Sequence, residues 1–172
     1  MRSVFKERPD AVELSRRVRG FWGKVWVWWP VAFMIAVIAC ESTPTFSAEK
    51  TGGWIRPWLE QYFGHINDTL WYLVHRAIRK SGHFTGYGLV GLTWLRAWWL
   101  TLPRSQFFYD ALLALLGTGL VASCDEWHQT YLPNRHGSPW DVLLDCSGAI
   151  ALQLIVYVAM RSFKPKQLAR AA

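Results

Sequence analysis

Long apolar blocks separated by charged stretches constrain this sequence more than any other feature. A helix needs about 20 apolar residues to cross the roughly 30 Å hydrocarbon layer of a membrane. Four blocks approach this length, and they cover residues 21–40, 83–102, 107–124 and 140–160. Many of the 12 tryptophans lie near block ends, and indole rings favour the headgroup region. The expected fold is therefore an all-α integral membrane protein with about four transmembrane helices.

The 172 residues predict a single domain. This transmembrane domain is expected over residues 21–160, between a basic tail at 1–20 and another at 161–172. The net charge is +7, but the basic residues lie mostly in the tails and beside apolar blocks, which indicates orientation signals and not nucleic-acid binding.

The distribution of basic residues also predicts an orientation. With the N-terminus inside, the inner side holds 13 of the Lys and Arg residues and the outer side holds 6. Cytoplasmic segments are the ones enriched in these residues. We therefore expect a multi-pass protein of the bacterial cytoplasmic (inner) membrane with both termini in the cytoplasm. Segments 41–82 and 125–139 are then expected to face outwards.

The first apolar block has two alternative interpretations. It could be a cleaved signal peptide, although a charged leader of about 20 residues is long for one. It could also be a lipoprotein signal, because the segment from Val37 to Cys40 resembles a lipobox. The three cysteines lack the spacing of a disulfide framework or a zinc site, and we expect Cys124 and Cys146 to be small buried hydrophobic residues.

The long connection after the first block has a helical pattern. We expect a break at Gly52-Gly53, after which apolar residues recur at helical spacing from Trp54 to Ile78. A Trp-rich amphipathic helix pair that lies in the membrane interface explains this pattern. Gly64 is expected to separate the two helices, and Asn67 or Asp68 to cap the second.

Polar and ionisable residues gather at the outer ends of the predicted spans. Such groups are costly to place in a membrane and are functional candidates for that reason. Lys80, His83 and Tyr87 share one helical face. The further candidates at this depth are Glu41, Asp125, Glu126, Gln129, Arg135, Asp141 and Asp145. We expect a paired and hydrogen-bonded cluster, with merely solvated helix ends as the alternative. His128 and His136 are expected to be ordinary loop histidines.

Small residues along the spans predict close helix packing. The positions concerned are Gly82, Gly86, Gly91, Gly119, Ser123 and Gly148.

The same polar residues carry a family resemblance. Residues 80–87, KSGHFTGY, are similar to the K-x-x-H-F-x-x-Y signature of the VanZ-like membrane proteins. Asp125-Glu126-x-x-Gln129, followed by Arg135, Asp141 and Gly148, is similar to that family's D-E-x-x-Q, R, D and G run. The family is named after a protein associated with teicoplanin resistance. The resemblance therefore implies a role at the cell envelope and supports the predicted fold and site.

Asp145 departs from this pattern, because the family usually has Asn there. An extra carboxylate calls for a compensating cation. A cation held by His83 with the neighbouring carboxylates is therefore an alternative, and oxygen-rich ligation would favour Mg, Mn or Ca over zinc. The sequence by itself assigns no cofactor and no metal ligands.

Three classes of function fit these observations. The first is recognition of an amphiphilic envelope molecule, either a lipid-linked precursor or a lipoglycopeptide, at the outer face. The ligand-binding candidates are Lys80, Tyr87, Gln129, Arg135, Asp141, Asp145 and Glu41. The second is a membrane-embedded hydrolase or transferase with His83, Glu126 and Asp125 as acid–base groups. The third is a proton-coupled transporter or a scaffold, which the confinement of the polar groups to one face disfavours. The expected partner is a membrane lipid or lipid-linked molecule, and homo-oligomerisation stays open.

Overall fold

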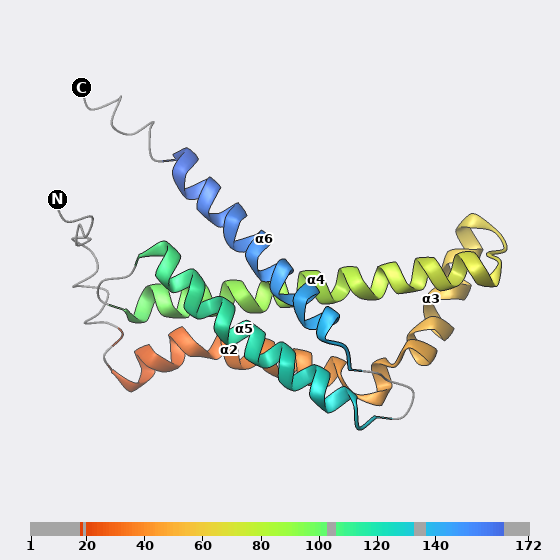
Figure 1. The fold of residues 1–172 in the computed structure, drawn as a ribbon, viewed down its shortest axis with the longest axis horizontal. Coiled ribbons are helices and arrows are strands. Elements are labelled where there is room, and N and C mark those ends of the chain that lie inside the picture. Colours follow the sequence, from red (N-terminus) through yellow and green to blue (C-terminus); the bar gives the residue numbers. More distant parts are fainter. Residues whose placement is uncertain (1–17, 19, 103–105, 133–136, 164–172) are drawn as a thin grey trace.

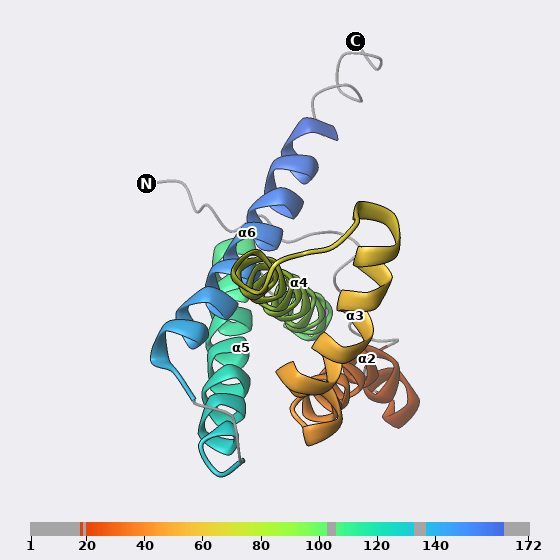
Figure 2. The same ribbon diagram turned by 90° about the vertical axis from the view of Figure 1, so that its right-hand side faces the viewer.

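A computed structural model describes residue 18 and residues 20–102, 106–132 and 137–163. Within these ranges every regular element is helical, which confirms the all-α fold class. The elements are α2 (Phe21–Glu41), the short 3-10 helix η1 (Pro44–Phe46), α3 (Ala48–Phe63), α4 (Asp68–Thr101), α5 (Phe107–Gln129) and α6 (Pro139–Phe163). The central helix is α4, which contacts α2, α5 and α6. In the view along α4, α2 and α3 lie on one side of it, and α5 and the first part of α6 lie on the other (Figure 2).

Three of the described helices are long and apolar enough to cross a membrane, namely α2, α5 and the part of α6 up to Ser162. Their outward faces are apolar. On α5, for example, Leu112, Leu116 and Leu120 recur at one-turn spacing and are all exposed. Contiguous apolar surface of this kind is unfavourable in water, whereas lipid tails solvate it. The chain is therefore built as a multi-pass membrane protein.

The remaining long helix, α4, differs from what the sequence predicted. A separate interfacial helix and a span over residues 83–102 were expected, but α4 is one continuous helix of 34 residues. Its length is ~51 Å at about 1.5 Å per residue, and its first part, beside α3, extends beyond α2, α5 and α6 (Figure 1). It is not among the three helices that are long and apolar enough to cross a membrane, and its sequence includes the charged residues Arg76, Lys80 and Arg96. A fourth crossing by residues 83–102 thus stays a prediction.

The expected break at Gly52-Gly53 is wrong, because α3 runs through both glycines. The reason lies in the packing of α3 against α4. A Cβ atom on Gly52 would lie 3.4 Å from the Trp71 ring and 3.8 Å from the His75 ring. These are ordinary van der Waals distances, and the neighbouring Thr51 Oγ1 lies 3.2 Å from His75 Nε2 on α4, so contacts with α4 outweigh the low helix propensity of glycine.

The turn between α3 and α4 follows the prediction. Gly64 ends α3 with a φ of 79°, a conformation that glycine adopts without strain. Asn67 caps α4, because its side-chain oxygen accepts a hydrogen bond from the Leu70 amide at 2.8 Å. The chain therefore reverses direction at the residues where the sequence indicated a reversal.

An ion-pair network closes this turn. Glu60 accepts hydrogen bonds from the Ile66 amide at 3.1 Å and from Arg56 Nε at 3.2 Å. Arg56 also lies 2.8 Å from Asp68. The Ile66 amide and the guanidinium lower the pKa of Glu60, because both stabilise its ionised form.

The crossing of α4 and α6 depends on small residues. A Cβ atom on Gly148 would lie 2.0 Å from the Phe84 carbonyl oxygen, and one on Gly91 would lie 2.7 Å from the Ala149 Cβ. The predicted packing role is thus confirmed for Gly91 and Gly148. It is wrong for Gly82, where an added Cβ would meet nothing within 4 Å.

Aromatic rings form a contact between α2 and α4. The Trp28 ring meets the Trp94 and Trp98 rings edge-on, with centroids 5.7 and 5.0 Å apart, and so joins α2 to α4.

The predicted burial of cysteines is wrong for Cys124, which is exposed on α5, while Cys146 is half-buried. Cysteine behaves as a small hydrophobic residue, so it is also compatible with a helix face that contacts lipid.

Candidate functional site

Four helices bring polar side chains together at one end of the bundle. The last turns of α2 and α5 and the first turn of α6 meet there, beside the middle of α4 (Figure 1). The crossing of α4 and α6 at Gly148 sets the height of His83 relative to Asp145, since both residues lie within a turn of that contact.

Asp125 on α5 is held by two hydrogen bonds to the same oxygen. Tyr87 donates its hydroxyl to Oδ2 at 3.1 Å, and Gln129 donates Nε2 to Oδ2 at 3.0 Å. Tyr87 is only 1% exposed, and Gln129 is buried as well. A buried phenol normally has a hydrogen-bond partner, so the Tyr87–Asp125 contact fixes both the α4–α5 register and the orientation of the carboxylate.

His83 on α4 faces Asp145 on α6. The distance from His83 Nδ1 to Asp145 Oδ1 is 3.4 Å, and Asp145 is fully buried. The two groups are close enough to interact through charge, but their geometry does not make a hydrogen bond. Among the described residues, no donor reaches either oxygen of Asp145. A buried carboxylate without hydrogen bonds is costly, so this pair needs an explanation beyond packing.

Two further contacts join α6 to its neighbours. The Ser138 amide donates to Glu126 Oε2 at 2.7 Å, which ties the start of α6 to the end of α5. Lys80 on α4 donates a hydrogen bond to Asp141 Oδ1 on α6. Glu126 is buried, whereas Lys80 and Asp141 are partly exposed. Glu126 is therefore a buried acidic group whose second oxygen, Oε1, takes no part in that contact.

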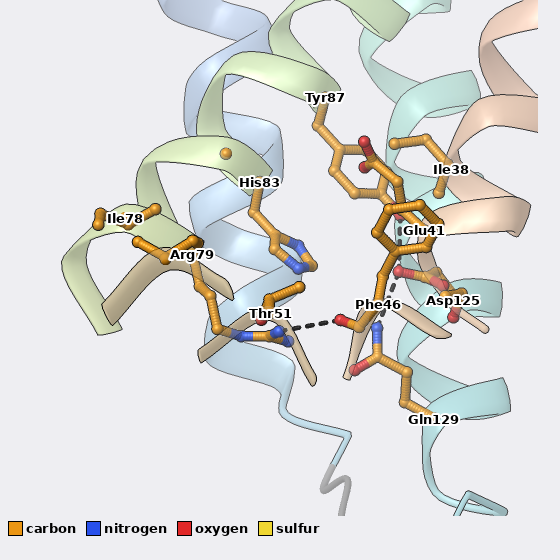
Figure 3. A pocket seen from close by; sticks show the side chains of 13 residues that line it. Ile38, Glu41, Phe46, Thr51, Ile78, Arg79, His83, Tyr87, Asp125 and Gln129 are labelled. Atoms are coloured by element: carbon orange, nitrogen blue, oxygen red, sulfur yellow. Dashed lines mark hydrogen bonds between the residues drawn. The ribbon is translucent and has the colours of Figure 1, made fainter. Parts of the chain in front are cut away.

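A pocket of about 290 Å³ opens beside this cluster. Figure 3 shows His83, Tyr87, Asp125 and Gln129 around it together with residues from α2, η1 and α3. The lining residues are Ile38, Glu41, Ser42, Phe46, Thr51, Ile55, Ile78, Arg79, Gly82, His83, Tyr87, Asp125 and Gln129. The walls are thus partly aliphatic and aromatic and partly charged.

Sequence reasoning missed Arg79 as a pocket residue. It donates from Nη1 to the Phe46 carbonyl at 3.2 Å and so helps to hold η1 over the pocket (Figure 3). The signal was present, because residues 79, 83 and 87 recur every four positions and so follow one side of a helix. The sequence had assigned Arg79 only to the polar face of an interfacial helix.

The structure brings most of the described candidates next to at least one other candidate. These residues are Lys80, His83, Tyr87, Asp125, Glu126, Gln129, Asp141 and Asp145. Glu41 lines the pocket, while Arg135 and His136 lie outside the described residues. The loop placement of His128 is wrong, because it belongs to the last turn of α5, where its Nδ1 lies 3.4 Å from Ser42 Oγ.

The cluster can do two kinds of chemistry. His83, Asp125 and Glu126 each offer a ligand atom, and these three atoms lie within 4.8 Å of one another. Such a set can exchange protons with a bound molecule or hold a divalent cation. Its position beside the pocket places either chemistry within reach of a ligand.

Comparison with known proteins gives one family. The family model described as VanZ/LLP1 matches residues 21–160. No curated protein matches the chain, and no solved structure matches it.

Proposed function

The chain belongs to the VanZ/LLP1 family, and from this premise we propose that it recognises an amphiphilic envelope molecule at the outer face of the bacterial cytoplasmic membrane. A lipid-linked precursor and a lipoglycopeptide both combine an acyl part with a polar part. The protein binds such a molecule in the pocket beside the polar cluster, with the acyl part towards the surrounding lipid.

The composition of the pocket supports this proposal most. Ile38, Phe46 and Ile78 give it apolar walls, whereas Arg79 and His83 give it polar ones. Ligand sites in proteins typically combine apolar walls with a few convergent polar groups. Basic side chains nearby, such as Arg79 and Lys80, suit a phosphate or carboxylate on the polar part of the ligand.

Blocking the pocket tests the proposal. Gly82 lines the pocket, and a Cβ on it would meet no atom within 4 Å, so Gly82→Leu should fill the pocket without a clash. Gly53 on α3 has the same open space but does not line the pocket, which makes Gly53→Leu the matched control.

The measurement is mass spectrometry of amphiphiles that co-purify with each protein. We expect wild type and Gly53→Leu to retain the same molecule and Gly82→Leu to lose it. Equal retention in all three proteins would contradict recognition in this pocket.

Drug susceptibility identifies the class of ligand. Wild type, His83→Ala and Glu126→Gln are expressed at matched levels in a teicoplanin-sensitive Gram-positive host. Resistance that rises with wild type and is lost in both variants would assign a lipoglycopeptide or the precursor it targets. No rise, with the protein present in the membrane, would remove that ligand class for this chain.

A second candidate function is an enzyme that acts on the same molecule. The observation that favours it is the proximity of His83, Asp125 and Glu126 at the edge of the pocket. A histidine beside carboxylates can serve as general acid or base. Glu126→Gln separates the two functions: an enzyme would lose turnover while it still bound the molecule, whereas a pure binding protein would show no turnover in wild type either.

A further inference from the structure

We propose that His83, Asp125 and Glu126 bind one divalent cation, with Asp145 as the residue that positions His83. The three ligand atoms come from α4 and α5 and lie within 4.8 Å of one another. That spacing allows a single ion at about 2.0–2.6 Å from each of them. The site would be a fixed part of the pocket wall and not a property of the bound amphiphile.

Hydrogen bonds orient both carboxylates for such a role. Tyr87 and Gln129 occupy Oδ2 of Asp125, and the Ser138 amide occupies Oε2 of Glu126. Within the described part of the chain, Oδ1 of Asp125 and Oε1 of Glu126 lie outside these hydrogen bonds. Carboxylates that bind metals are commonly held in this way through one oxygen while the other contacts the ion.

Asp145 provides an independent observation. Its carboxylate is fully buried, receives no hydrogen bond from the described residues, and lies 3.4 Å from His83 Nδ1. Histidines that bind metals through one ring nitrogen usually donate the other N–H to a carboxylate. If His83 gives Nε2 to the cation, its Nδ1–H points at Asp145, and the cation helps to offset the buried negative charge of Asp145.

The position of the cluster indicates what the ion would contact. His83 and Asp125 line the pocket, so an ion between them would face it with part of its coordination sphere open. One imidazole and two carboxylates suit Mn²⁺ well, because carboxylates favour hard cations and imidazole favours transition metals. An anionic group of the ligand could then bind the ion directly. The site itself does not depend on the proposed ligand.

Metal titration of the purified full-length protein tests the proposal without any ligand. After treatment with a chelator, Mn²⁺ is titrated and free Mn²⁺ is followed by electron paramagnetic resonance. Wild type should bind one ion per chain, and His83→Ala and Glu126→Gln should each lose this binding. Asp145→Asn should weaken it on the order of 10- to 100-fold, as expected for a residue that orients a metal ligand.

The control variant is Glu49→Gln. It removes an exposed carboxylate in the first turn of α3 that neither lines the pocket nor belongs to the three proposed ligands. Its Mn²⁺ affinity should stay within about threefold of wild type, since only an exposed charge is lost. Thermal unfolding in detergent confirms that each variant is folded. No stoichiometric binding by wild type, or equal binding by a folded His83→Ala protein, would overturn the proposal.

Discussion

At the scale of single residues, the site depends on which partner each polar side chain meets. Tyr87 is the clearest case. Its ring is buried at the α4–α5 contact, and its hydroxyl reaches Asp125 at 3.1 Å. Packing and hydrogen bonding therefore act on the same residue, so its replacement should affect both the stability of the bundle and the position of the Asp125 carboxylate.

Tyr87→Phe keeps the ring but removes this hydrogen bond. Hydrogen bonds to charged groups contribute about 1.5–3 kcal/mol, so the variant should unfold at a lower temperature than wild type in the same detergent. Tyr131→Phe is the matched control, because Tyr131 is 71% exposed. Equal unfolding temperatures for wild type and Tyr87→Phe would show that the contact with Asp125 contributes nothing.

Glu60 makes a pH-dependent prediction at the turn between α3 and α4. Its pKa is lower in the folded protein than in a free chain, so its contribution is present above the unfolded pKa of about 4.3 and is lost as the pH falls through the folded pKa. Protection of the Ile66 amide, corrected for its intrinsic exchange rate, should therefore decrease in hydrogen-exchange measurements as the pH falls below the unfolded pKa and through the folded one. Glu60→Gln should show the same protection at all pH values. If protection of the Ile66 amide still decreased at low pH in Glu60→Gln, the pH dependence could not be assigned to Glu60.

Residue types and spacing were enough to select candidates but not to pair them. The i, i+3, i+7 spacing of Lys80, His83 and Tyr87 placed them on one face, as found. Their partners Asp141, Asp145 and Asp125 could not be assigned, because pairing depends on the height and rotation of α5 and α6 against α4. The periodicity within one helix determines neither its height nor its rotation relative to another helix.

At the scale of elements, helix crossings determine where the site forms. The α4–α6 crossing brings Gly148 against the Phe84 backbone, and His83 and Asp145 flank this contact. A change at the crossing should therefore move the site even though it touches none of the polar residues.

Gly148→Ala tests this coupling. The added Cβ would lie 2.0 Å from the Phe84 carbonyl oxygen, so the helices must separate, at a cost of about 1–3 kcal/mol. We expect a lower unfolding temperature together with weaker Mn²⁺ binding. Gly82→Ala is the control, since its Cβ meets nothing within 4 Å and alanine is the better helix former. Equal unfolding temperatures for Gly148→Ala and Gly82→Ala would show that α4 and α6 are not in such close contact at Gly148.

The elements also show where local signals failed. The sequence predicted a break at Gly52-Gly53 from intrinsic propensity, but α3 runs through both glycines, and Thr51 Oγ1 lies 3.2 Å from His75 Nε2 on α4. Conversely, the turn signals at Gly64 and Asn67 were right, because a positive φ and a side-chain cap are local properties. In this part of the chain, the feature that depends on tertiary contacts was the one missed.

At the scale of the whole molecule, recognition at the outer face requires one orientation in the membrane. The cluster and pocket lie at the end where α2 and α5 finish, and the distribution of Lys and Arg predicts that this end faces outwards. The lengths of the apolar blocks predicted α2, α5 and α6, the three described helices that are long and apolar enough to cross a membrane. This prediction succeeded because the length of an apolar block is a direct property of the sequence.

Cysteine labelling tests the orientation. In a cysteine-free background, one cysteine is placed at Gly64 and another is added after Ala172. A membrane-impermeant maleimide should label the first in intact cells and the second only after permeabilisation. The reverse pattern would place the pocket on the cytoplasmic side and would exclude recognition at the outer face.

The central claim is that the pocket holds one kind of amphiphile in preference to bulk lipid. A photoreactive amino acid at Ile78, which lines the pocket, tests it most directly, with Leu112 on the exposed face of α5 as the control position. After illumination of living cells, mass spectrometry of the purified protein identifies the cross-linked molecule at each position. We expect one distinct amphiphile with a polar part at residue 78 and ordinary membrane lipid at residue 112. The same ordinary lipid at both positions would contradict it.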